Sequence, residues 1–150
     1  MYLAILFVHV LSAIIALGYN ATYAVWLARG SMQREHLLFA LRGIQFMDNR
    51  VANPAYGLLL LTGIAMVVIS GRSWHQLWIE LALALWFLLA ILGFAGYTPA
   101  LKRQIQIVET SGPDDPAYAA ANARQTMFGI ITSVMAVVIV ALMVFRPGGA

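Results

Sequence analysis

The chain has no cysteine among its 150 residues. Disulfide bonds, thiolate-held iron–sulfur clusters, thiolate-ligated haem and a cysteine nucleophile are therefore all excluded. Charge is also scarce, because 10% of the residues are Asp, Glu, Lys or Arg whereas 62% are hydrophobic. Soluble domains carry roughly a quarter charged residues, and a chain of this size could not hide so much apolar surface from water. The composition indicates an integral membrane protein.

Motifs of soluble enzymes and of nucleic-acid-binding proteins are missing as well. The sequence contains no Walker loop, no dinucleotide-binding fingerprint and no His-Glu-x-x-His zinc pattern. Its nine lysines and arginines form no basic patch of the kind that binds nucleic acid. The first residues, Met1-Tyr2-Leu3-Ala4-Ile5, lack the positive segment of a signal peptide, so we expect a first helix that is retained.

Four apolar runs are long enough to cross a bilayer, which takes about 20 residues. They cover residues 3–27, 51–70, 77–97 and 127–145. None shows the strict alternation of a β-barrel strand, so all four are expected to be helices. The sequence thus predicts an all-α fold, a four-transmembrane-helix bundle formed by one domain over residues 1–150.

The distribution of basic residues predicts the orientation of this bundle. Seven of the nine lie in the first and third connections: Arg29, Arg34, Arg42, Arg50, Lys102, Arg103 and Arg124. The positive-inside rule makes these connections cytoplasmic and puts both termini outside, in a multi-pass protein of the bacterial cytoplasmic (inner) membrane. We expect tags at both termini to be accessible from the non-cytoplasmic side. A C-terminal reporter that is active only in the cytoplasm would contradict this topology.

The two cytoplasmic connections are themselves expected to be partly helical. Apolar residues recur there at helical spacing: Leu37, Leu41 and Ile44 in the first, and Leu101, Ile105 and Val108 in the third. The first stripe predicts either an interfacial helix or a cytoplasmic extension of the second span. Asp115 followed by Pro116 predicts the start of the fourth helix, as N-cap and first helical residue. Pro54 predicts a kink near the cytoplasmic end of the second span.

Two ionisable residues lie clearly within the predicted spans, His9 and Glu80. Such residues are costly in lipid and are commonly functional. His9 shares a helical face with Tyr2, Ala16, Asn20 and Tyr23. Both His9 and Glu80 lie near the outer surface, so a hydrogen bond between them is expected if no ligand is bound. The alternative is that His9 only joins helices and that Glu80 is hydrated.

Other polar and sulfur-containing side chains are further candidates. The fourth helix has a face of small and polar residues: Asn122, Thr126, Gly129, Ser133 and Ala136. We expect this face to pack against another helix, because small residues let helix backbones approach in membranes. Met66 and Met135 are candidate haem ligands, although methionine more often fills gaps in a core.

Several residues are spaced along the chain as in known membrane proteins. They are His9, Gly18, Met47, Arg50, Pro54, Thr62-Gly63, Trp74, Trp78, Asn122 and Arg146-Pro147. Over nearly its whole length the chain resembles a bacterial family of predicted four-helix integral membrane proteins of unknown function. It is more loosely similar to HemJ-type protoporphyrinogen oxidases and CopD-type copper-resistance membrane proteins. The HemJ resemblance implies haem b bound through the first-helix histidine, here His9, whereas Glu80 stands where that family has a third-helix lysine.

Three functional interpretations remain open at this stage. The first is a redox-linked membrane protein that uses His9 to bind haem b, or that works with a quinone. The second is a non-catalytic accessory or assembly subunit that binds other membrane proteins, or a second copy, through its small-residue faces. The third is a small transporter with a proton-coupled His9–Glu80 pair. All three share the lipid bilayer as partner, and the resemblance favours the first.

Overall fold

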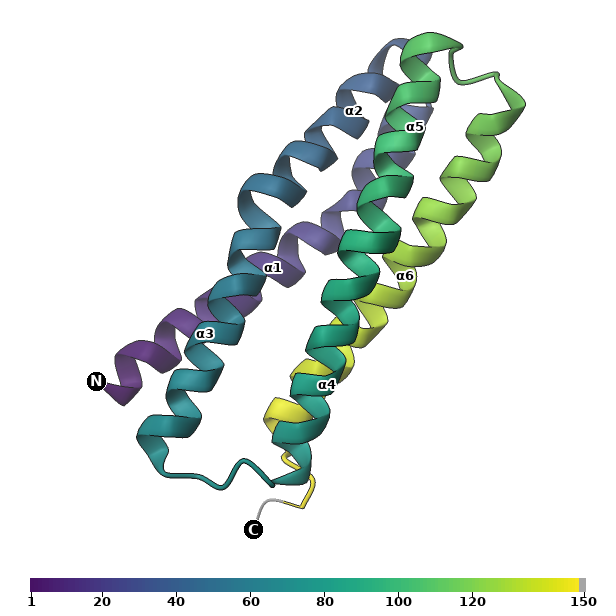
Figure 1. Cartoon of the computed structure of the whole chain (residues 1–150). Helices are drawn as coiled ribbons and strands as arrows, with labels where there is room; N and C mark the ends of the chain where they lie inside the picture. The colour runs from purple at the N-terminus through teal and green to yellow at the C-terminus, as the bar shows by residue number, and fades with distance from the viewer. Residues whose placement is uncertain (149–150) are drawn as a thin grey trace.

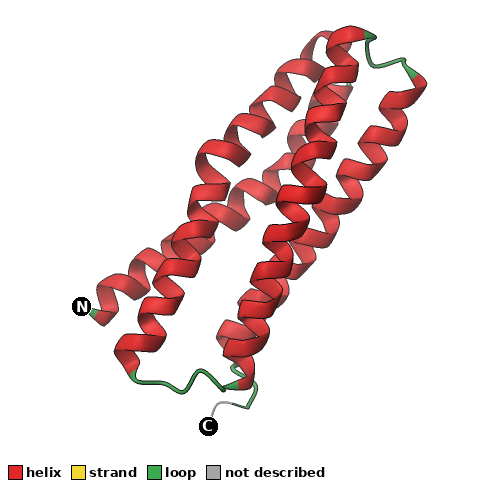
Figure 2. Cartoon of the chain, in the orientation of Figure 1, coloured by secondary structure: helices red, strands yellow, loops and turns green. Residues whose placement is uncertain are grey.

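The computed structural model describes residues 1–148, apart from the side chain of Arg34, and these residues form helices joined by short loops without strands (Figure 2). The last two residues of the predicted domain lie outside this range. Four helical segments have the length and apolar composition of membrane spans: Tyr2–Ser31, Glu35–Ser70, Leu77–Thr110 and Pro116–Phe145. The expected all-α, four-span architecture is confirmed.

Two of the four segments contain a wider helical turn. The elements in chain order are α1 (Tyr2–Ser31), α2 (Arg34–Met47), the π-helical turn η1 (Asp48–Ala52), α3 (Asn53–Ser70), α4 (Leu77–Leu92), the π-helical turn η2 (Gly93–Tyr97), α5 (Thr98–Thr110) and α6 (Pro116–Phe145). The stripe in the first connection therefore belongs to an extension of the second span and not to a separate interfacial helix. At 1.5 Å per residue, the 36-residue segment is about 54 Å long. It exceeds a hydrocarbon core of roughly 30 Å, so its end projects beyond the lipid tails.

Local signals determine where two of these helices begin and end. Asp115 is the N-cap of α6, and its side-chain Oδ1 accepts a hydrogen bond from the Ala117 N–H at 2.8 Å. Pro116 follows as the first helical residue, as the sequence predicts. Helix α3 ends at Gly71, which has the left-handed conformation (φ 64°) that glycine adopts without steric cost.

The helices associate as two pairs. Helix α1 packs along α2, η1 and α3, while α6 packs along α4, η2 and α5. Contacts of α2 with α5, and of α1 with α6, join the two pairs. Helices α3 and α4, which a loop over residues 71–76 connects, have backbones that stand apart in Figure 1, but Val67 of α3 packs with Trp78 and Ile79 of α4 in a small buried cluster. The bundle is consequently closed at its α2–α5 end and less closely packed between α3 and α4.

The largest cluster of buried side chains lies at the closed end. It consists of Tyr23, Leu37, Leu41, Ile44, Tyr97, Leu101 and Ile105. Both predicted stripes contribute, because α2 and α5 bury them against each other. By contrast, many large apolar side chains elsewhere are exposed, among them Leu3, Phe7, Leu61, Phe87, Ile91 and Val137. Apolar side chains gain nothing from leaving lipid, so a dense core is needed only where the helices project into water.

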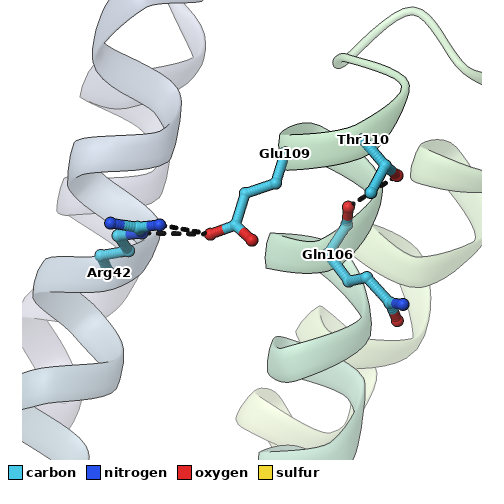
Figure 3. Close-up of polar contacts among 4 residues, drawn as sticks. All are labelled: Arg42, Gln106, Glu109 and Thr110. Carbon is cyan, nitrogen blue, oxygen red and sulfur yellow. Dashed lines mark hydrogen bonds and ion pairs between the residues drawn. The ribbon is translucent and has the colours of Figure 1, made fainter.

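An ion pair also joins α2 to α5 across the surface of the closed end (Figure 3). The Arg42 guanidinium donates to Glu109 Oε1 through Nε at 3.1 Å and Nη2 at 2.7 Å. Both side chains are exposed, and such a pair contributes about 0–1 kcal/mol. The buried stripes beside it, and not this ion pair, supply most of the energy that holds the closed end together.

Candidate functional site

Two cavities lie between the helix pairs, each lined by residues of α1, α3, α4 and α6. The cavity that contains Asp48, here called the Asp48 cavity, has a volume of about 690 Å³. The cavity that contains His9, here called the His9 cavity, has a volume of about 610 Å³. Tyr56 and Trp86 line both and mark the boundary between them. Both volumes fall in the range of small-molecule and cofactor sites.

His9 faces α3 and has a polar partner there. Its Nδ1 lies 2.8 Å from Thr62 Oγ1. The Thr62 hydroxyl has one proton, which it donates to the Leu58 carbonyl at 2.5 Å. Oγ1 therefore accepts from His9, so Nδ1 carries the ring proton and Nε2 keeps a free lone pair. The His9 ring also interacts with the backbone carbonyl of Leu59 on α3.

Small, sulfur-containing and cationic residues complete the His9 cavity. A Cβ atom at Gly63 would lie 3.4 Å from His9 Cε1, so glycine lets the ring lie close to the α3 backbone. Met66 lines this cavity, whereas Met135 lines neither cavity. Two cations, Arg72 and Arg146, also line it, and the Arg146 guanidinium lies 5.6 Å from the centre of the Trp78 ring.

The prediction of a hydrogen bond between His9 and Glu80 is wrong. Glu80 Oε1 lies instead 3.1 Å from Nδ1 of His75, an exposed residue of the loop that precedes α4. Similar depth along two helices says nothing about which helices are neighbours. Helix α1 packs against α3 and α6 but not against α4, which carries Glu80.

Asp48 is the acidic residue that sequence reasoning missed. It is 8% exposed and accepts a hydrogen bond from Asn53 Nδ2 to Oδ2 at 3.4 Å. The Tyr23 hydroxyl faces the same carboxylate without a hydrogen bond of ordinary geometry. No lysine or arginine lines the Asp48 cavity, and Asp48 has no ion pair in the part of the chain that the structure describes.

Both π-helical turns flank the Asp48 cavity. In η1 the Asn53 N–H donates to the Asp48 carbonyl, and in η2 the Thr98 N–H donates to the Gly93 carbonyl, five residues back in each case. Such a turn inserts one extra residue into a helix and is frequent at functional sites. A π-helical turn that ends two residues before Pro54 interrupts the second segment at the place where the sequence predicts a kink.

Two of the polar residues predicted within the spans, Asn20 and Ser133, line the Asp48 cavity. Asn20 Nδ2 donates to the Tyr56 hydroxyl at 2.6 Å, and Ser133 lies on the wall that α6 contributes. Gln125 Nε2 donates to the Tyr97 hydroxyl at 3.1 Å, while Gln125 Oε1 is buried and has no partner. The small-residue face of α6 therefore forms a cavity wall as well as a packing surface.

A signal for Asp48 is present in the sequence. Asp48 follows Ile44 by four residues and Leu41 by seven, so it continues the stripe that the structure buries. Placing the start of the second span at residue 51 put Asp48 in a connection and hid this relation. A lone acidic residue on an otherwise apolar helical face was the observation that could have identified it.

Comparison with known proteins supports the membrane assignment. Residues 3–147 match the family described as predicted integral membrane protein (DUF2269), so the chain belongs to this family. No curated protein and no solved structure shows significant similarity to it.

Proposed function

We propose that this integral membrane protein binds haem b in the His9 cavity, with His9 as ligand to the iron, and so takes part in electron transfer. The observation that carries the proposal is the hydrogen bond from His9 Nδ1 to Thr62 Oγ1 at 2.8 Å. A histidine ligand is normally held in this way, with one nitrogen bound to the protein and the other directed to the metal. Haem supplies one-electron chemistry when bound.

The rest of the cavity fits the same group. Its walls are mostly apolar, as the faces of a porphyrin require. Arg72 and Arg146 offer two guanidinium groups for the two propionate carboxylates, which arginine binds well. Met66 lines the cavity from α3 and Met143 from α6, and either thioether could serve as a second ligand to the iron.

The interpretation as a proton-coupled transporter loses its support. It depended on a His9–Glu80 pair, and each residue has a different partner. The interpretation as a non-catalytic accessory subunit makes the opposite prediction to haem binding, namely a protein without a chromophore. One spectrum therefore separates the two remaining interpretations.

The decisive measurement is the absorption spectrum of the purified protein after expression with haem supplied. We expect a Soret band in the wild type and its loss in His9→Ala. His75→Ala is the matched control, because His75 is an exposed histidine outside the cavity, and it should leave the band unchanged. A wild type without haem, or a His9→Ala protein that retains it, would overturn the proposal.

Thr62→Val provides a second variant that changes the hydrogen bond and little else. Valine keeps the shape of threonine but cannot accept from Nδ1, so the ring loses its preferred orientation. Loss of such a partner typically weakens metal binding by about 10- to 100-fold. We expect haem affinity in a titration to fall by about 10-fold in Thr62→Val. An unchanged affinity would show that the hydrogen bond does not prepare His9 for a metal.

A further inference from the structure

The Asp48 carboxylate is buried without a positively charged partner. It is 8% exposed, and Arg50, two residues further along the chain, is exposed and forms no ion pair in the described structure. A charged carboxylate away from water is very costly unless a cation or several hydrogen bonds compensate it. The hydrogen bond from Asn53 is long, at 3.4 Å, and cannot compensate a full charge. The described residues supply no cation to Asp48, so the carboxyl group is either protonated or paired with a cation from outside the chain.

Besides the Tyr23 hydroxyl, which faces the Asp48 carboxylate, two buried polar atoms of residues that line this cavity have no hydrogen-bond partner among the described residues. They are Trp86 Nε1 and Gln125 Oε1. Tyr23 is 7% exposed and Gln125 is 4% exposed, so water reaches neither side chain freely. Unpaired buried polar groups are rare in native proteins, because each costs about 1–3 kcal/mol. A ligand with polar atoms in this cavity would give Gln125 a partner, and Trp86 lies at the boundary with the His9 cavity.

Aromatic rings form much of the remaining wall. Tyr23 and Tyr97 stack with ring centres 6.4 Å apart and planes inclined by 18°. Tyr56, Trp86 and Phe94 also line the cavity. The face of an aromatic ring attracts a cation, and the attraction is larger when water is excluded. A carboxylate among aromatic rings is a suitable environment for an organic cation, and the apolar walls suit the body that carries it.

We infer that the Asp48 cavity binds an amphipathic organic cation, with its charge at Asp48 and its apolar body between the aromatic rings. The cation belongs either to a free amine or ammonium compound or to the headgroup of a zwitterionic phospholipid. This inference concerns a different cavity from the proposed haem site and does not depend on it. The π-helical turn η1 contributes directly, because it carries Asp48 on the cavity side of the helix.

Tetraphenylphosphonium is a suitable probe, because tetraphenylborate has nearly the same size and apolar surface with the opposite charge. Equilibrium dialysis of the full chain in detergent micelles measures the binding of both. We expect saturable binding of tetraphenylphosphonium and affinity for tetraphenylborate that is at least 10-fold weaker. Comparable binding of the two ions would show that the cavity recognises apolar surface alone, and absence of saturable binding of the cation would also overturn the inference.

Asp48→Asn tests the carboxylate with almost no change of shape. We expect its affinity for tetraphenylphosphonium to be at least 10-fold lower than that of the wild type. Glu35→Gln is the matched control, because Glu35 is exposed and does not line the cavity, and it should bind like the wild type. Equal binding by Asp48→Asn and the wild type would overturn the inference, and helical content measured by circular dichroism verifies that both variants fold.

Displacement of the bound probe identifies the source of the natural cation. If phosphatidylethanolamine added to the micelles displaces tetraphenylphosphonium, the site accepts a lipid headgroup. If dodecyltrimethylammonium displaces it and the lipid does not, the ligand is a free ammonium compound. If neither displaces the probe, the site does not recognise the proposed class of cation, and the inference fails.

Discussion

Replacing Leu41 by alanine is expected to lower the free energy of unfolding by about 2–5 kcal/mol. Leu41 is fully buried at the closed end of the bundle, where the apolar stripes of α2 and α5 pack against each other. The smaller side chain loses its transfer energy and leaves a cavity that its neighbours fill only in part. Unfolding by heat or by increasing denaturing detergent, followed by circular dichroism, measures the loss.

Leu61→Ala is the matched control for this substitution. Leu61 is also a leucine in the long second segment, but it lies in α3 and is 65% exposed. Detergent or lipid contacts its side chain before and after unfolding, so we expect a change of less than about 0.5 kcal/mol. Equal losses in the two variants would mean that the closed end is not the stabilising core.

Replacing Gly30 by alanine is expected to destabilise the protein by about 1–3 kcal/mol, because it forces α1 and α2 apart. A Cβ atom at Gly30 would lie 2.5 Å from the Cβ of Ala40, which is much closer than two non-bonded carbon atoms can approach. The Ala40 Cβ is attached directly to the α2 backbone, so it cannot rotate away. The same unfolding measurement detects the effect, and cross-linking between α1 and α2 would report their separation.

Two further variants show whether this contact is the cause. The double variant Gly30→Ala/Ala40→Gly moves the methyl group from one helix to the other and should recover most of the lost stability, provided that Ala40→Gly alone is also measured. Gly18→Ala is the control for alanine in the middle of α1, because a Cβ atom there meets nothing within 4 Å. We expect Gly18→Ala to be neutral or slightly stabilising. A destabilisation as large as that of Gly30→Ala would point to a general effect of replacing glycine in α1.

The positions of the helices along the chain follow from the sequence because their signals are local. A long apolar run in lipid has to form a helix to satisfy its backbone, whatever its neighbours are. The Asp115–Pro116 start of α6 depends on a hydrogen bond within three residues, and the structure has it. The stripe of Leu37, Leu41 and Ile44 depends on helical period alone, and all three residues are buried.

The two π-helical turns were not evident from the sequence. Each differs from an α-helix by one hydrogen-bond register, and no single residue type demands that change. Their effect on the structure is nevertheless large, because a turn of this kind changes which residues of the following helix face the cavity. Asp48 in η1 and Tyr97 in η2 both line the Asp48 cavity.

The sequence by itself determined the membrane class, the four spans, the start of α6 and the presence of a polar face around His9. Only the tertiary structure decided that His9 contacts Thr62, that Glu80 contacts His75, and that Asp48 lies in a cavity. The physical reason is the same in each case. Depth and helical face depend on the residues of one segment, whereas the neighbour of a side chain depends on how all four segments pack, and α1 packs against α3 and α6 instead of α4.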